Sequence, residues 1–243
     1  GILMPTPAAV LDALTLLSAG TKHEPGLGEL VAVDLGGATT DVYSIASGAP
    51  SRPDTVVRGL VEPREKRTVE GDMGMRYSVR GIVEAAGAER IAELADMPES
   101  RVRERVEYLS QHTAFLPDDD ESRRLDFALA SLAVEAAVRR HAGSVEEVYT
   151  PAGRMYAQTG KDLTNVRLVI GTGGALLQAA EPERVAKSAL YSDRDPFSLR
   201  PRAAKVLIDK RYILAAMGLL SQKYPDAALT IMKRELTGNG TEQ

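Results

Sequence analysis

A glycine turn with polar neighbours stands in the stretch VAVDLGGATTD, residues 31–41. Gly36 and Gly37 allow backbone amides to approach an anion closely, and successive amides at such a turn form an anion-binding concavity. The hydroxyls of Thr39 and Thr40 add donors for phosphate oxygens. The stretch therefore predicts a loop that holds the phosphates of a nucleotide.

Two carboxylates, Asp34 and Asp41, flank this turn. They are not expected to bind phosphate directly, because both groups carry negative charge. Binding a hydrated Mg²⁺ or orienting an attacking water fits their charge and their position. We therefore predict Asp34 as a catalytic residue and a metal ligand, and Asp41 as a second metal ligand. The alternative is an ordinary tight hairpin with two turn-favouring aspartates.

A second glycine cluster follows an apolar run in LVIGTGGALL, residues 168–177. A strand that passes through Gly171, Gly173 and Gly174 into a helix gives a second turn with close backbone approach. The cluster is not a Rossmann fingerprint, and no GK[ST] loop occurs in the chain. On its own, a glycine-assisted strand-to-helix turn explains the cluster equally well.

The elements around these turns predict an α/β protein. A helical insertion is expected at about 85–120, because that stretch is charged and reads as short helices. The stretch 145–159 reads as a hairpin, or as a strand and a loop. In α/β sheets ligands bind at the carboxyl ends of strands, where both glycine turns fall. Strands are predicted at 29–33, 41–46, 55–61, 167–170 and 204–208, and helices at 7–19, 121–141, 211–222 and 226–236.

The helix at 121–141 has the clearest pattern. Leu125, Leu129 and Leu132 lie at helical spacing on one face, and the stripe continues to residue 136. Asp120 or Ser122 is expected to cap its first turn.

Composition excludes several classes of protein. With 26% charged residues of both signs interspersed and a net charge of −4, there is no basic stripe for nucleic acid or for a membrane surface. The absence of cysteine excludes disulfides, thiolate metal sites and an iron–sulfur activase. It suits a reducing cytoplasm, which is the expected location. The chain opens GILMPTPAAV, which suggests a processed chain or an excised fragment.

Taken together and in order, the motifs resemble the second half of the actin-like ATPase (ribonuclease H-like) fold. LMPTPAAVLDALTLLSAG resembles its first connecting helix and VAVDLGGATTD its second phosphate loop. VIGTGGAL resembles its adenosine loop, and RYILAAMGLL, with Gly218 at a close-packing position, its second connecting helix. The combination of DLGGATTDVYS, VEGDMGMR and VIGTGGALL is most similar to the MutL/GlmL family, reactivating factors found beside cobalamin-dependent mutases such as glutamate mutase.

The resemblance implies a mixed sheet flanked by helices, with ATP or ADP and Mg²⁺ as cofactors. It implies phosphate contacts for the first loop, Asp34 beside the metal or the catalytic water, and Asp41 as a site carboxylate or a clamp on the hairpin. It also implies nucleoside contacts for the second loop and a place for Gly71 and Asp72 along the same cleft. The function that it implies is ATP-dependent reactivation of a cobalamin-dependent mutase. A small-molecule kinase and a non-enzymatic actin-like scaffold are the alternatives.

One element of the superfamily pattern is missing, namely a DxGxT-type first phosphate loop. We therefore expect residues 1–243 to be one lobe, with the N-terminal lobe of the parent protein as its partner. Losing about three phosphate contacts, each worth roughly 1.5–3 kcal/mol, weakens nucleotide binding by roughly a thousandfold to a millionfold. The expectation is a parent ATPase and a chain that is inactive alone.

Overall fold

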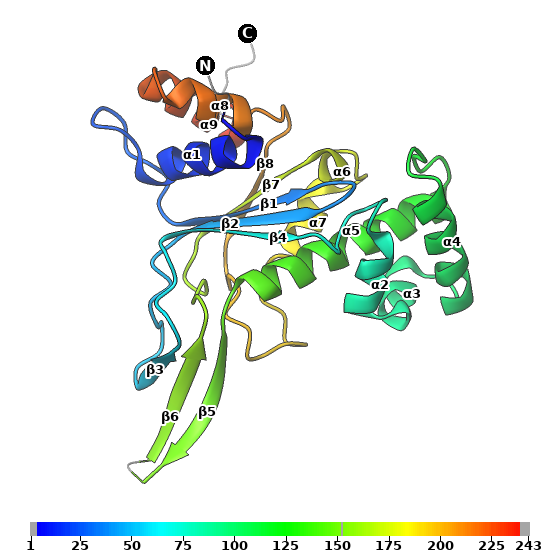
Figure 1. The fold of residues 1–243 in the computed structure, drawn as a ribbon, viewed down its shortest axis with the longest axis horizontal. Helices are drawn as coiled ribbons and strands as arrows, with labels where there is room; N and C mark the ends of the chain where they lie inside the picture. Colours follow the sequence, from blue (N-terminus) through cyan, green and yellow to red (C-terminus); the bar gives the residue numbers. More distant parts are fainter. Residues whose placement is uncertain (1–3, 152, 239–243) are drawn as a thin grey trace.

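The computed structural model describes residues 4–151 and 153–238, and shows a mixed α/β fold with two sheets (Figure 1). The strands are β1 Leu30–Leu35, β2 Thr40–Ile45, β3 Thr55–Arg58, β4 Glu65–Glu70, β5 Ser144–Thr150, β6 Gly153–Thr159, β7 Leu168–Thr172 and β8 Lys205–Ile208. The helices are α1 Thr6–Ala19, α2 Val79–Ala86, α3 Ala88–Ala95, α4 Glu99–Gln111, α5 Asp120–His141, α6 Gly174–Leu177, α7 Pro182–Lys187, α8 Leu214–Ser221 and α9 Pro225–Thr237.

The larger sheet has the order β4-β2-β1-β7-β8 and lies between two layers of helices (Figure 1). Strands β4, β2 and β1 are antiparallel neighbours, and β1, β7 and β8 are parallel. Side chains of β1 point alternately to the two faces, and both faces are buried. Val31 and Val33 pack with α5 on one side, whereas Leu30 and Ala32 pack with α1, α8 and α9 on the other. This is the fold class expected of an actin-like ATPase lobe.

Helices α1 and α8 cross at close range. A methyl group added at Gly218 would overlap the backbone of Ala9, so only glycine lets the two helices approach this closely. The predicted close-packing position in the second connecting helix is therefore confirmed.

Helix α5 is confirmed over almost its predicted range, and Leu125, Leu129 and Leu132 are buried. Its cap is not the one predicted. Asp119 is the N-cap and its carboxylate accepts the Ser122 amide at 2.6 Å, while the Ser122 hydroxyl bonds back to the Asp119 amide at 3.2 Å. Asp120 and Ser122 both lie inside the first turn. In a capping box the N-cap residue stands three positions before the N3 residue, and Asp119 has this spacing from Ser122.

One predicted strand needs correction, and one observed strand was missed. The strand expected at 55–61 ends at Arg58, and Leu60 and Val61, which favoured its extension, are 94% and 88% exposed. Strand β4 was not predicted, because its sequence EKRTVE is mostly charged and polar. Its pairing with all six residues of β2 holds it in the sheet.

The hairpin option for 145–159 is confirmed by β5 and β6, although Ala152 at the predicted turn lies outside the described residues. With β3, these strands form a three-stranded sheet that projects from the body of the molecule (Figure 1).

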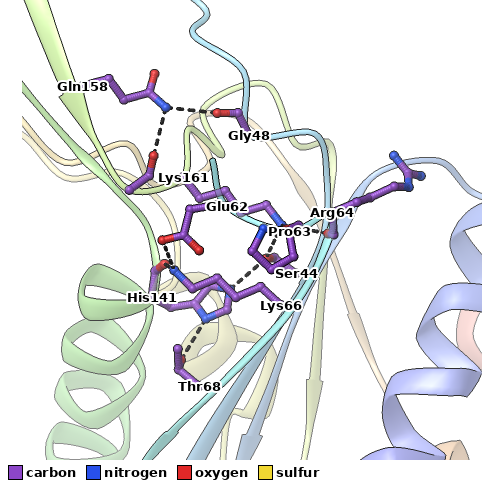
Figure 2. A network of polar contacts seen from close by, with 11 residues as sticks. Ser44, Gly48, Glu62, Pro63, Arg64, Lys66, Thr68, His141, Gln158 and Lys161 are labelled. Carbon is purple, nitrogen blue, oxygen red and sulfur yellow. Dashed lines mark hydrogen bonds and ion pairs between the residues drawn. The ribbon is translucent and has the colours of Figure 1, made fainter. Parts of the chain in front are cut away.

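A buried polar network holds the root of this projecting sheet (Figure 2). Lys161 follows β6 and donates to the Ser44 hydroxyl at 3.0 Å and to the carbonyls of Pro63 and Arg64 at 2.8 and 2.7 Å. His141 precedes β5, and its Nε2 lies 2.8 Å from the same Ser44 hydroxyl. Burial lowers the pKa of His141 to about 3, so the ring is neutral. The network ties both ends of the β5–β6 hairpin to β2.

Within residues 4–151 and 153–238, no helix combines the length and the apolar character that crossing a membrane requires.

Candidate functional site

The two glycine loops meet at the carboxyl ends of two neighbouring inner strands of the larger sheet. Strands β1 and β7 are parallel neighbours, with Asp34 in register with Thr172, so the turns that follow them lie side by side. Gly173 has a φ of 100°, and a methyl group there would overlap the Leu35 carbonyl oxygen and crowd the Asp34 carboxylate. Only glycine allows this contact between the loops. The structure thus brings together two clusters that lie more than 130 residues apart in the sequence.

The first loop is a tight turn anchored from behind. The Gly36 amide donates to the Thr39 carbonyl at 2.9 Å, and the carbonyls of Gly36 and Gly37 accept the amides of Met75 and Arg76 at 3.1 and 2.8 Å. In contrast, the amides of residues 37–39 have no acceptor in the described part of the chain. Unpaired backbone donors on an anchored turn favour an anionic ligand.

Asp34 is the least satisfied carboxylate of the site. It stands directly across from Asp41 in the β1–β2 register, and its side chain accepts no hydrogen bond from the described residues. Burial, with added repulsion from Asp41 and Asp209, raises the pKa of Asp34 to about 6. Like charges directly opposite each other destabilise a sheet, so this arrangement calls for a cation.

Asp41, unlike Asp34, has hydrogen-bond partners for its carboxylate. Its carboxylate accepts the Arg67 Nε at 2.9 Å and the Thr39 hydroxyl at 3.2 Å, which clamps β2 to β4 and to the loop. The Thr40 side chain is fully buried, and its hydroxyl donates to the Met73 carbonyl at 2.7 Å. The structure therefore shows bracing contacts for both residues, and their ligand contacts stay predictions.

A third carboxylate, Asp209, was missed by the sequence analysis. It is 2% exposed and follows β8, and it accepts the Thr172 hydroxyl at 3.1 Å and the amides of Ile213 and Leu214 at 2.9 and 3.2 Å. It thereby joins the second loop to the start of α8. The signal that identifies Asp34, an acidic residue at the end of a buried strand, is also present at Asp209 in KVLID.

No group of three or more His, Asp or Glu side chains within residues 4–151 and 153–238 is placed to hold a metal ion. Asp34, whose side chain accepts no hydrogen bond from the described residues, is the carboxylate left for the predicted Mg²⁺, and Asp41 stands opposite it in the strand register. Both metal contacts stay predictions.

A cavity of about 570 Å³ opens beside the loops. Gly37 stands at one end, Ala175 of α6 lines another wall, and α5 and the segment 113–117 close the rest. This volume is within the range of small-molecule sites. The stretch predicted as a helical insertion thus supplies one wall of the cavity.

The polar floor of this cavity was not predicted. Arg76 pairs with Asp126 at 2.6 Å, and its Nε and NH1 donate to the carbonyls of Phe115 and Met75 at 3.0 and 2.7 Å. Burial raises the pKa of Asp126, against the opposing effect of Arg76. Arg76 ends the motif VEGDMGMR but was given no role, and Asp126 lies in α5 outside any motif, so only the fold shows that they pair.

The remaining predicted residues differ in position. Gly174 has no close neighbour, and a side chain at this position would enter open space. Gly171 is enclosed by Ala186 and other side chains inside the sheet layer. Gly71 is open to solvent, and the Asp72 carboxylate is paired with Arg140 at 3.0 Å. Of the predicted site residues, only Gly37 lines the cavity; Gly171, Gly173, Gly174, Gly71 and Asp72 do not.

Comparison with known proteins gives a consistent result. Residues 1–236 match the family model described as "MutL protein". The chain is 47% identical over 236 residues to "Protein MutL" of Clostridium tetanomorphum, which covers 97% of this chain and 51% of that protein. The chain therefore spans about half the length of the curated relative that it matches. By this match the chain belongs to the MutL protein family.

Proposed function

We propose that this chain is the nucleotide-binding half of an ATPase, with the phosphates at the first glycine loop and the nucleoside in the 570 Å³ cavity. The observation that carries the proposal is the junction of the two loops through Gly173, next to open amides and an unsatisfied Asp34. Bound ATP supplies a transferable phosphoryl group and three anionic phosphates, which these donors complement.

The residues of the chain then have separate tasks. The amides of residues 37–39 bind phosphate oxygens, and Asp34 holds a hydrated Mg²⁺ or orients a water. The Arg76–Asp126 pair presents polar atoms to the nucleoside. Catalysis needs a second set of phosphate contacts and exclusion of water, so we expect hydrolysis only when the other half of the protein closes the site.

For the whole protein we propose ATP-dependent reactivation of a cobalamin-dependent mutase. Family membership and the ATP-type site support this proposal, and its mutase part rests on the family resemblance alone. The test is release of damaged cofactor from an inactivated mutase by a full-length protein with Mg-ATP. We expect Gly37→Val to abolish release, because Gly37 belongs to the phosphate loop and lines the cavity. Release that is independent of ATP, or unchanged in Gly37→Val, would refute it.

A further inference from the structure

A second cavity, of about 290 Å³, lies at the root of the projecting sheet, beside the Lys161 network of Figure 2. It is bounded by the end of α5, the end of β6 and the segment 195–198, and it shares no lining residue with the cavity proposed for the nucleoside. Its volume is several times the roughly 30 Å³ that one water occupies in the liquid, so it has room for a small molecule.

Ser198 lines this cavity with an unused hydroxyl. The residue is 2% exposed, and its Oγ has no hydrogen-bond partner in the structure. A buried hydroxyl without a partner costs roughly the desolvation of that group, and native proteins rarely tolerate this. The hydroxyl therefore lacks a partner, and a turn of the side chain toward the cavity would bring it to a ligand there.

Arg200 stands two residues further along the chain. The segment is extended here, since the Leu199 amide and the Phe197 carbonyl bond to Gly143 and Val145, and side chains two residues apart in extended chain share a side. Arg200 is fully buried, forms one long hydrogen bond of 3.3 Å to the Ser188 carbonyl, and leaves Nε and NH2 without partners. A buried guanidinium in this condition needs an anionic or polar partner.

Charges of both signs line the cavity. Lys66 is paired with Glu62 at 3.0 Å, and Arg140 is paired with Glu70 at 2.7 Å. Arg139, on the cavity wall, forms no ion pair with the described residues. Asp195 also lines the cavity without an ion pair to the described residues, and with Glu62 it favours a ligand that carries a single charge.

We propose that this cavity binds a small oxyanion of the phosphate or carboxylate type. Arg139 and Ser198 contact it directly, and Arg200, which is buried and does not line the cavity, adds positive charge near Asp195 and Arg139. The site joins the end of α5 to the end of β6, so occupancy stabilises the root of the projecting sheet.

The test uses the intact chain, with inorganic phosphate and acetate as separate probes and sodium chloride at equal ionic strength as the reference. At about ten times its dissociation constant, the bound oxyanion should raise the Tm by about 3–6 °C. Amide resonances of Gly143 and Gly160, which line the cavity, should shift with the same saturation curve. The probe with the larger effect identifies the preferred oxyanion.

Variants separate this site from the nucleotide loop. Arg139→Gln and Ser198→Ala should each weaken binding about tenfold, the effect of one hydrogen bond to a charged group. Arg103→Gln removes the same charge from the surface of α4 and should have no effect, and Gly37→Val, in the phosphate loop, should retain binding here. The proposal is overturned if neither probe exceeds chloride, if both cavity variants bind as the wild type does, or if Gly37→Val alone removes the effect.

Discussion

Replacing Asp34 by asparagine should stabilise this protein, although Asp34 is the residue that we expect to act in the site. Its carboxylate accepts no hydrogen bond from the described residues and lies opposite Asp41. A pKa of about 6, against an ordinary 3.8, corresponds to roughly 3 kcal/mol of cost for the ionised form. Partial contact with water reduces this figure, so we expect a gain of about 1–3 kcal/mol at pH 7.5.

The pH dependence gives a sharper test of the same reasoning. Because the native pKa of Asp34 is above the unfolded value, the native state binds more protons between about pH 4 and pH 6. The free energy of unfolding should therefore fall as the pH rises through this window. In Asp34→Asn this contribution is absent.

Urea unfolding at several pH values measures both effects. Asp193→Asn is the matched control, because it removes the same charge from an exposed position without an ion pair in the described residues. The reasoning is refuted if Asp34→Asn is less stable than the wild type at pH 7.5, or if the pH dependence of the two proteins is the same between pH 4 and 6.

Three further predictions concern stability, each measured by urea or thermal unfolding. Gly173→Ala should lose more than about 2 kcal/mol, because the residue has a φ of 100° and no room for a methyl group; a loss below about 0.5 kcal/mol would contradict the loop junction. Lys161→Met should lose about 1–3 kcal/mol, since it removes three hydrogen bonds and leaves the Pro63 carbonyl without a donor in the described residues. Burial lowers the pKa of Lys161 to about 8; Lys66 and Arg64 also lower it, and Glu62 and Glu29 oppose the shift. The stability of the wild type should therefore rise between about pH 8 and 10.5. A rise that persists in Lys161→Met would show that another group causes it. Asp119→Ala should cost about 1 kcal/mol and Asp120→Ala much less, and the reverse order would show that the cap is misassigned.

Much of the fold could be predicted because its signals are local. The glycine loops, the apolar stripe of α5 and the close-packing position Gly218 each carry a pattern that needs no knowledge of distant residues. Strand β4 could not be predicted, since its charged sequence becomes a strand only by pairing with β2. The over-long β3 arose from Leu60 and Val61, whose apolar character suggested burial that does not occur.

The candidate site shows the same division. Asp34 and the two glycine loops were identified from sequence, but the structural reason for Gly173, its contact with Leu35, depends on the β1–β7 pairing. The pairing of Arg76 with Asp126 could not be predicted, because the two residues meet only when α5 packs beside the loop after β4. Asp209 carried a usable signal that the sequence analysis did not apply.

Calorimetric titration of Mg-ADP tests the central claim, that a nucleotide binds where the two glycine loops meet. It should be run on this chain and on a protein extended to the length of the relative, each with Gly37→Val and with Ala203→Val, which adds bulk at an exposed position outside the cavity. We predict weak binding to this chain and much tighter binding to the longer protein, both lost in Gly37→Val and kept in Ala203→Val. Absence of binding to the longer protein, or binding that Gly37→Val leaves unchanged, would contradict the account.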